Sequence, residues 1–115
     1  MIKVYGIPSC NSVKKAFDWL KLNNFEYEFH DYKKKGIDEE KLKEWCKVFG
    51  WENLINKAGT TWKGLSEEEK NGVVDEASAI EFLKDSTSAI KRPIVESNGK
   101  HLMRFDEAKY AEALL

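Results

Sequence analysis

Two cysteines offer the most versatile chemistry in this chain, and their sequence surroundings differ. Cys10 follows a short apolar stretch at positions 2–7 and precedes residues that repeat with helical spacing. The first backbone N–H groups of a helix lack an intrahelical partner and carry the positive end of the helix dipole, which favours a thiolate over a thiol. We therefore predict that Cys10 is a nucleophile; the alternative is an inert loop cysteine.

The residues after Cys10 extend this hypothesis. The N–H groups around Asn11 and Ser12 could hold an oxyanion or a carboxylate. The Ser12 hydroxyl could point towards Cys10 or cap the helix. Lys14 and Lys15 would fall in the first turn, where the dipole disfavours cations, so a solvated face is the preferred interpretation. Lys14 is retained as an accessory candidate for anion binding.

Cys46 lies in a different pattern. It belongs to an apolar stripe with helical spacing, and a cysteine on such a face usually packs in a core. Position 13, where a Cys-x-x-Cys motif would place its second cysteine, is Val13. A redox cycle at Cys10 must therefore use an external thiol. The stripe consists of Leu42, Trp45, Cys46 and Phe49.

The sequence around Cys10 predicts a βαβ unit, whose elements would position the thiol. Apolar residues at 2–7 predict a strand, and alternation over 25–32 predicts a second, parallel strand. Asn23 and Asn24 are plausible ends for the helix between them. The spacing i, i+3, i+4, i+7 indicates that helix, and it is formed by Val13, Ala16, Phe17 and Leu20.

The rest of the chain predicts a helical insertion followed by ββα. A basic loop at 33–36 precedes the insertion, short helical pieces are expected within 51–65, and Ala77, Ile80 and Leu83 form the stripe of a further helix. The run 93–96 is strand-like, 97–99 is a hairpin turn, and 100–105 is the partner strand. Polar residues are expected to cap the helices, with Glu69 completing a capping box: Asp38, Ser66, Asp75 and Asp106.

Composition limits the class of protein. A length of 115 residues with 42% hydrophobic and 34% charged residues predicts one globular domain spanning 1–115. The 19 basic and 20 acidic residues argue against a direct nucleic-acid partner. No apolar run suits a signal peptide or a membrane span. We therefore expect a cytoplasmic protein with reduced cysteines, no membrane partner and no metal.

Five strings in this sequence resemble the ArsC/Spx family, and most closely its YffB-type branch. They keep the family's order and extend over essentially the whole chain. The strings are VYGIPSCNSVKKA at 4–16, HDY at 30–32, GTTW at 59–62, IKRPIV at 90–95 and LMRF at 102–105.

The resemblance implies an α/β, thioredoxin-like fold with a helical insertion, and a cis-proline, here Pro93, that faces the cysteine. It implies that Arg92 and Arg104 bind an oxyanion or glutathione carboxylates. They are the only arginines among the 19 basic residues, and the planar guanidinium suits such groups. The family's third arginine falls near Asn56 and Lys57, so Lys57 is a further accessory candidate.

The function that the resemblance implies is a glutathione-dependent monothiol reductase, with glutathione as co-substrate and glutaredoxin as a potential partner. Arsenate reductases of the family carry a histidine four residues before the cysteine, where this chain has Gly6. True arsenate reduction is therefore an alternative. A second alternative is an Spx-like regulator that binds RNA polymerase, although Val13 removes the redox switch that many Spx proteins carry.

Overall fold

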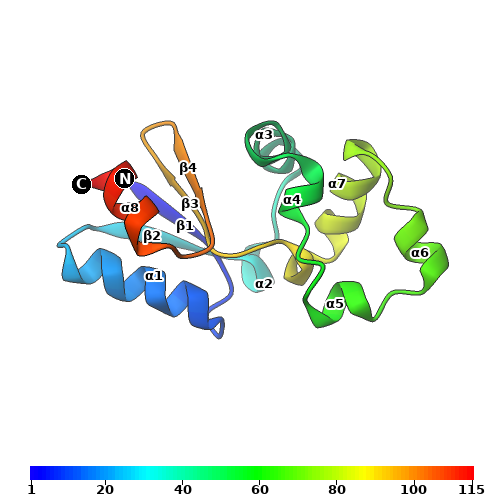
Figure 1. The fold of residues 1–115 in the computed structure, drawn as a ribbon, viewed down its shortest axis with the longest axis horizontal. Coiled ribbons are helices and arrows are strands. Elements are labelled where there is room, and N and C mark those ends of the chain that lie inside the picture. Colours follow the sequence, from blue (N-terminus) through cyan, green and yellow to red (C-terminus); the bar gives the residue numbers. More distant parts are fainter. The chain divides into compact units, whose positions relative to one another are not determined.

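The structure, a computed structural model, describes all 115 residues and divides into two compact units. The sheet unit comprises Met1–Lys35 and Arg92–Leu115, and the helical unit comprises Gly36–Lys91. The two ends of the chain therefore build one unit, and the helical unit is inserted between them (Figure 1).

The sheet unit contains a four-stranded sheet in the order β2-β1-β3-β4. Strand β1 pairs with β2 in parallel, as predicted, and with β3 antiparallel; β3 and β4 form an antiparallel hairpin. The elements of this unit are β1 (Ile2–Gly6), α1 (Asn11–Leu22), β2 (Tyr27–Asp31), α2 (Tyr32–Lys35), β3 (Ile94–Ser97), β4 (Lys100–Met103) and α8 (Glu107–Leu114).

Helices α1 and α8 cover one face of this sheet (Figure 1). Alternate strand residues point to this face, since successive side chains of a strand point to opposite sides. Ala16 and Leu20 of the predicted stripe of α1 lie in this cluster, together with Trp19, which the stripe did not include, and α8 adds Tyr110. Burial of these apolar groups stabilises the unit. The cluster comprises Ile2, Val4, Ala16, Trp19, Leu20, Val95 and Tyr110.

Most helix caps agree with the prediction, whereas most strand ends differ from it by one or two residues. Strand β1 ends at residue 6 rather than 7, β2 covers 27–31 rather than 25–32, and β3 covers 94–97 rather than 93–96. Asn23 caps the C-terminus of α1, as expected, and Asn24 adopts a positive φ of 62°. Strand β4 ends at Met103 rather than at 105, because Arg104 leaves the extended region with a φ of 61°. Residues Tyr32–Lys35 form one helical turn, where the prediction had the last strand residue at 32 and a loop from 33.

The helical unit contains five helices and one 3-10 turn. The predicted caps are present: Asp38 accepts a hydrogen bond from the Lys41 N–H, and Ser66 and Asp75 each form a capping box. The predicted stripe of α7 is wrong at one position, because Ala77 is exposed and Ala79 is buried in its place. The elements are α3 (Glu39–Phe49), α4 (Trp51–Leu54), α5 (Thr60–Lys63), α6 (Glu67–Asn71), α7 (Glu76–Asp85) and η1 (Thr87–Ala89).

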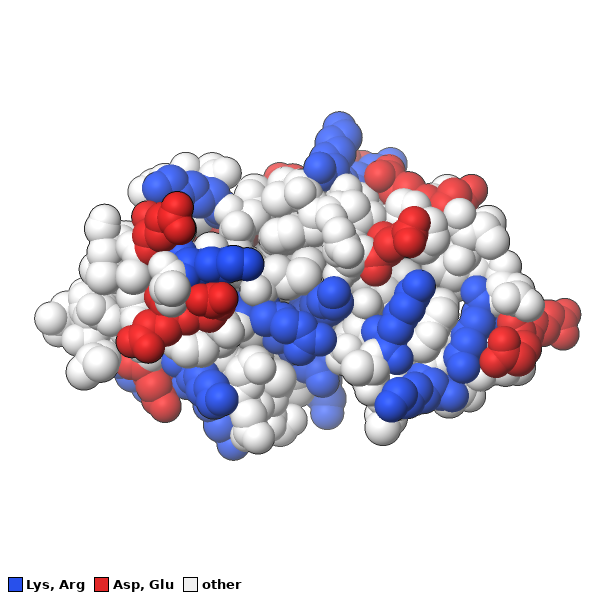
Figure 2. Space-filling view, viewed as in Figure 1, with Lys and Arg blue, Asp and Glu red and all other residues white.

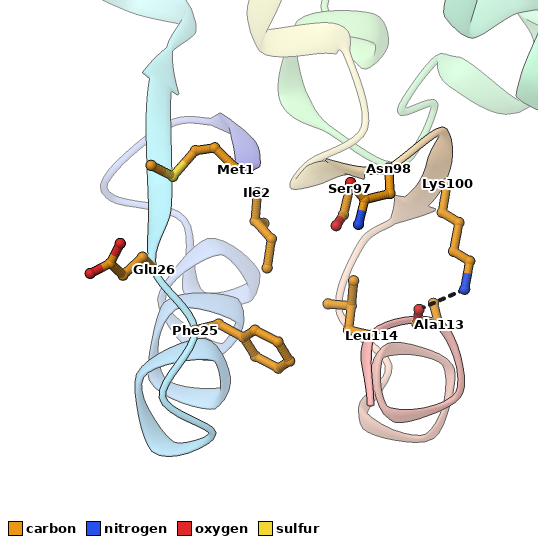
Figure 3. A pocket seen from close by; sticks show the side chains of 9 residues that line it. All are labelled: Met1, Ile2, Phe25, Glu26, Ser97, Asn98, Lys100, Ala113 and Leu114. Atoms are coloured by element: carbon orange, nitrogen blue, oxygen red, sulfur yellow. Dashed lines mark hydrogen bonds between the residues drawn. The ribbon is translucent and has the colours of Figure 1, made fainter.

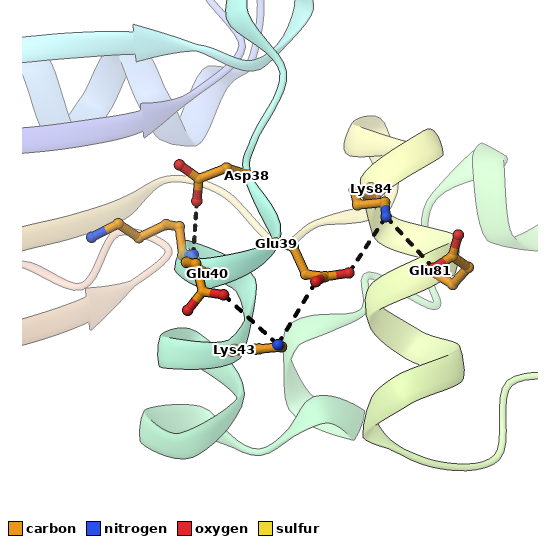
Figure 4. A network of polar contacts seen from close by, with 7 residues as sticks. Asp38, Glu39, Glu40, Lys43, Glu81 and Lys84 are labelled. Carbon is orange, nitrogen blue, oxygen red and sulfur yellow. Dashed lines mark hydrogen bonds and ion pairs between the residues drawn. The ribbon is translucent and has the colours of Figure 1, made fainter.

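Exposed charges link α3 to α7 in this unit (Figure 4). The ammonium nitrogen of Lys84 lies 3.5 Å from Glu39 and 3.6 Å from Glu81. Lys43 lies 3.7 Å from Glu39 and 3.8 Å from Glu40. Ion pairs this exposed contribute roughly 0–1 kcal/mol each, so the apolar contacts between the two helices dominate their packing.

The βαβ unit followed by a ββα unit defines a thioredoxin-like α/β fold, as predicted, with the helical unit inserted between the two halves. None of the helices has both the length and the apolar character needed to cross a membrane. Figure 2 shows both basic and acidic side chains on the face that it presents, and at its left the two kinds lie next to one another.

Candidate functional site

Cys10 is the N-cap residue of α1. Its backbone is extended, with φ −79° and ψ 129°, and its carbonyl accepts the first helical hydrogen bond from the Lys14 N–H at 3.1 Å. The Cys10 N–H donates to the Ile7 carbonyl at 3.1 Å, which fixes the turn between β1 and the helix. The thiol is partly exposed and makes no capping hydrogen bond, so it is available for chemistry at the positive end of the helix.

The strand register brings three further residues to the same end of the sheet. Tyr5 pairs with Ile94, so Gly6 at the end of β1 lies beside Pro93. Ile94 pairs with Met103, and the Arg104 N–H donates to the Pro93 carbonyl at 2.7 Å. Cys10, Pro93 and Arg104 therefore all belong to the end of the sheet where β1 stops and α1 starts. The Arg92–Pro93 peptide bond is cis, as the resemblance implied.

Gly6 allows this close approach. A Cβ atom at position 6 would lie 2.7 Å from Cγ2 of Val13, 3.7 Å from Cβ of Arg92 and 3.9 Å from Cα of Pro93. Val13 is fully buried in the first turn of α1. The missing side chain at position 6 therefore lets the start of α1 and the segment at Arg92–Pro93 pack against the end of β1.

The first turn of α1 corrects one expectation. Ser12 does not cap the helix, because the helix starts at Asn11 with Cys10 as its N-cap. Asn11 and Lys14 are exposed and Ser12 is half-buried. Their backbone N–H groups lie at the helix start, where an anion could be held.

Arg92 lies in a polar environment that the sequence did not reveal. Tyr32, at the start of α2, is fully buried. Burial raises the pKa of Tyr32 well above its usual value, the nearby Tyr5 and Glu96 raise it further, and the positive charge of Arg92 opposes them. The buried Tyr32 hydroxyl thus lies within electrostatic range of the Arg92 guanidinium and the Glu96 carboxylate.

The face of the sheet that carries Tyr5 continues this network. The Tyr5 hydroxyl donates to Glu96 at 3.1 Å, and Nε2 of His101 lies 3.3 Å from the other oxygen of Glu96. The ring of His30 lies 5.0 Å from that of Tyr5 and 6.3 Å from that of Tyr32. Both histidines thus have structural contacts, as their positions in strands suggested.

Two other predicted residues belong to the helical unit. Cys46 is buried, as its stripe predicted, and burial together with the charge of Glu76 raises the pKa of its thiol to about 11. The ammonium group of Lys57, an accessory candidate, lies 5.5 Å above the ring of Trp62. Lys57 thus makes a cation–π contact with Trp62, which belongs to the same unit.

A cavity of about 490 Å³ lies at the other end of the sheet from Cys10 (Figure 3). It is bordered by the start of β1, the turn between β3 and β4, and the end of α8. Its walls mix apolar side chains, Ile2, Phe25 and Leu114 among them, with polar ones such as Ser97 and Asn98. Lys100 at its rim donates a hydrogen bond to the Ala113 carbonyl at 2.9 Å. The cavity contains none of the residues with candidate chemistry.

A partly exposed cysteine at the start of the first helix of a thioredoxin-like fold, with a cis-proline at the same end of the sheet, places the protein in the class of thiol-site proteins with this fold. Comparison with known protein families identifies the family within this class. Residues 5–113 match the ArsC family, and the chain belongs to that family.

Similar proteins agree with this assignment. The structure of the YFFB protein is 44% identical, with complete coverage of both chains and a TM-score of 0.95. The solution structure of an arsenate reductase (ArsC) related protein from Brucella melitensis is 43% identical over 99% of this chain and 95% of that one, with a TM-score of 0.76. The global transcriptional regulator Spx of Streptococcus agalactiae is 26% identical over 93% of this chain and 78% of its own length.

Proposed function

We propose that this ArsC-family protein is a glutathione-dependent monothiol reductase in which Cys10 is the nucleophile. The observation that carries the proposal is the position of Cys10, partly exposed at the N-cap of α1, at the end of the sheet that also holds Pro93 and Arg104. The other cysteine, Cys46, is buried on the apolar face of α3. The cycle suits the cytoplasm, where glutathione keeps thiols reduced.

The reaction needs two exchange steps at Cys10. The Cys10 thiolate attacks one sulfur of a disulfide substrate, forms a mixed disulfide and expels the other sulfur as a thiolate. A glutathione thiolate then attacks the substrate sulfur of the mixed disulfide, regenerates Cys10 as a thiolate and leaves with that sulfur in a substrate–glutathione disulfide. After these two steps at Cys10, a second glutathione thiolate attacks the glutathione sulfur of that disulfide, which gives oxidised glutathione and releases the remaining substrate sulfur as a thiolate. The electrons come from glutathione. A sulfenate would enter by the same attack, with hydroxide as the leaving group.

The remaining predicted site residues have binding roles in this proposal. Arg92 and Arg104 bind the carboxylates of glutathione or an oxyanion, and the N–H groups around Asn11 and Ser12 hold negative charge. Pro93 shapes the groove for the substrate. Lys14 is an accessory cation, and glutaredoxin is a potential partner that removes glutathione from mixed disulfides.

The test is turnover of a small disulfide with glutathione, coupled to glutathione reductase and followed as NADPH oxidation. We expect Cys10→Ser to abolish turnover and Cys46→Ala to retain it. Arg92→Lys and Arg104→Lys should raise the KM for glutathione more than they lower kcat, because lysine lacks the planar fork. Turnover by the Cys10→Ser protein would exclude the mechanism.

Two alternatives have their own support. The Brucella melitensis structure is described as arsenate reductase related, so arsenate-dependent oxidation of glutathione in the presence of glutaredoxin should be measured alongside. The likeness to Spx of Streptococcus agalactiae supports a regulator. Stable capture of the C-terminal domain of the RNA polymerase α-subunit would favour that alternative. Val13 occupies the place of the second cysteine of a Cys-x-x-Cys motif and is buried, which argues against a dithiol switch.

A further inference from the structure

Arg104 has an unusual backbone conformation for its residue type. Its φ is 61°, and the other non-glycine residues with positive φ are Asn24 and Asn98. Asparagine tolerates this region, whereas it is disfavoured for other non-glycine L-residues because Cβ approaches the following carbonyl oxygen. Such conformations persist where the surrounding structure holds them in place, and they cluster at functional sites.

Hydrogen bonds hold the Arg104 backbone on both sides. Its N–H donates to the Pro93 carbonyl at 2.7 Å, and its carbonyl accepts from the Tyr110 hydroxyl at 2.5 Å. The first bond ties Arg104 to the segment with the cis peptide bond. The second ties it to α8, so the residue is held between the candidate site and the core.

Tyr110 is a rigid donor for this contact. Its ring is 1% exposed and lies edge-to-face against Trp19 at 5.7 Å and Phe105 at 5.0 Å. The helix that carries it is anchored at Asp106, whose side chain accepts from the Lys109 N–H. Burial raises the pKa of Tyr110, so its hydroxyl keeps the proton that it donates.

We propose that Tyr110 is a positioning residue for the Cys10 site: its hydroxyl holds Arg104 in the left-handed conformation and so sets the direction of the Arg104 side chain and the position of the Pro93 carbonyl. The inference rests on the proposed function, in which Arg104 and Pro93 contact the substrate. If Tyr110 served the core alone, losing its hydroxyl would change stability and leave binding at the site unaffected.

The test compares Tyr110→Phe with Tyr27→Phe. Both remove one hydroxyl, and Tyr27 packs on the same core cluster through Phe17, at 4.9 Å, rather than on Arg104. A neutral hydrogen bond contributes about 1 kcal/mol, so we expect Tyr110→Phe to raise the KM for glutathione about fivefold with kcat within about twofold. Tyr27→Phe should leave both constants unchanged. In an Arg104→Ala background, Tyr110→Phe should change the KM by less than it does in the wild type, because only the backbone contact with Pro93 remains to be affected.

A second measurement separates this inference from the proposed function. Amide hydrogen exchange at Arg104 should be about fivefold faster or more in Tyr110→Phe, and the one-bond Cα–Hα coupling, which reports the sign of φ, should shift from its wild-type value. If the wild-type protein lacks thiol turnover, the proposed function fails, and these two signals still decide the role of Tyr110.

Three results would overturn the inference. They are unchanged Arg104 exchange and coupling in Tyr110→Phe, an unchanged KM in that variant when the wild type is active, and an equal KM effect in the Arg104→Ala background. Should Tyr110→Phe not fold, the hydroxyl proton of Tyr110 in the wild type decides. A slowly exchanging signal with a cross-peak to Arg104 supports the contact, and its absence contradicts it.

Discussion

At the scale of single residues, the site depends on a side chain that is missing. Position 6 holds glycine, and a Cβ there would lie 2.7 Å from Cγ2 of Val13. Val13 is β-branched, fully buried and in a helix, so it has one strongly preferred rotamer and cannot turn aside. The conflict has to be relieved by movement of the first turn of α1, the turn that begins at Cys10.

Gly6→Ala should therefore destabilise the protein. Overpacking of this kind costs about 1–3 kcal/mol, measured as the free energy of unfolding in urea. Val13→Ala also destabilises by removing buried methyl groups, yet the double variant should lose less stability than the two single variants together, because the smaller residue makes room for the new methyl group. Strict additivity would contradict the contact.

The two cysteines should differ sharply in reactivity. Burial, aided by Glu76, raises the pKa of Cys46 to about 11, so at pH 8 only roughly one Cys46 thiol in a thousand is a thiolate. Iodoacetamide at pH 8 should modify Cys10 and spare Cys46 in the native protein, and modify both in denaturant. Mass spectrometry of peptides from wild type and Cys10→Ser reads the result. Rapid native labelling of Cys46 would show that its helix opens readily.

At the scale of elements, features that depend on the local sequence could be predicted, whereas features that depend on tertiary contacts could not. Capping residues were predictable because a cap acts within one helical turn, as Asp38 does on Lys41 and Ser66 on Glu69. The end of β4 was not, since it depends on the contact that Arg104 makes with Pro93. The burial of Ala79 instead of Ala77 also depends on which neighbours pack against α7.

The same distinction between local and tertiary signals applies to the candidate site. Cys10 could be found from the sequence because a strand, a turn and a helix follow one another locally. The surroundings of Tyr32 and Tyr110 could not be predicted. The Tyr110 hydroxyl donates to the Arg104 carbonyl and Tyr32 lies within electrostatic range of Arg92, and both neighbours are brought near by the fold. Tyrosines in apolar patterns predict core packing, and the pattern does not say where the hydroxyl points.

The cap of α7 should make stability depend on pH. Hydrogen bonds from the Ser78 N–H and hydroxyl hold the pKa of Asp75 below its usual value. A carboxyl group with a lowered pKa in the folded state stabilises above its unfolded pKa of about 3.9 and loses this contribution as pH falls through the folded value. The difference in Tm between wild type and Asp75→Ala should therefore shrink from pH 7 to pH 3. An unchanged difference would show that charge is irrelevant to the cap.

At the scale of the whole molecule, the chain builds two units of about 60 residues each, a size at which an isolated domain buries only about 60% of its unfolded surface and is marginal. The last residues of the helical unit pair with an earlier segment of the same unit. Ile55 and Ile90 form an antiparallel bridge, and the Lys91 N–H donates to the Leu54 carbonyl at 2.9 Å. The sheet unit resumes at the next residue, Arg92.

We predict that the two units unfold together as one domain spanning 1–115, because neither is large enough to be comfortably stable alone. Methyl signals of Val4 and Leu20 report the sheet unit in a urea titration, and those of Leu42 and Leu83 report the helical unit. All four should share one midpoint. Separate midpoints would show two folding units.

The contact between position 6 and Val13 has a consequence for how this chain can change through mutation. A side chain at position 6 is harmful while valine occupies position 13, so the order of substitutions matters. A smaller residue at position 13 would have to come first as a permissive step, and it would also be the step that alters the second position of a Cys-x-x-Cys motif. This epistasis keeps glycine at position 6 for as long as valine occupies position 13, whereas a smaller residue at position 13, cysteine included, needs no earlier change at position 6.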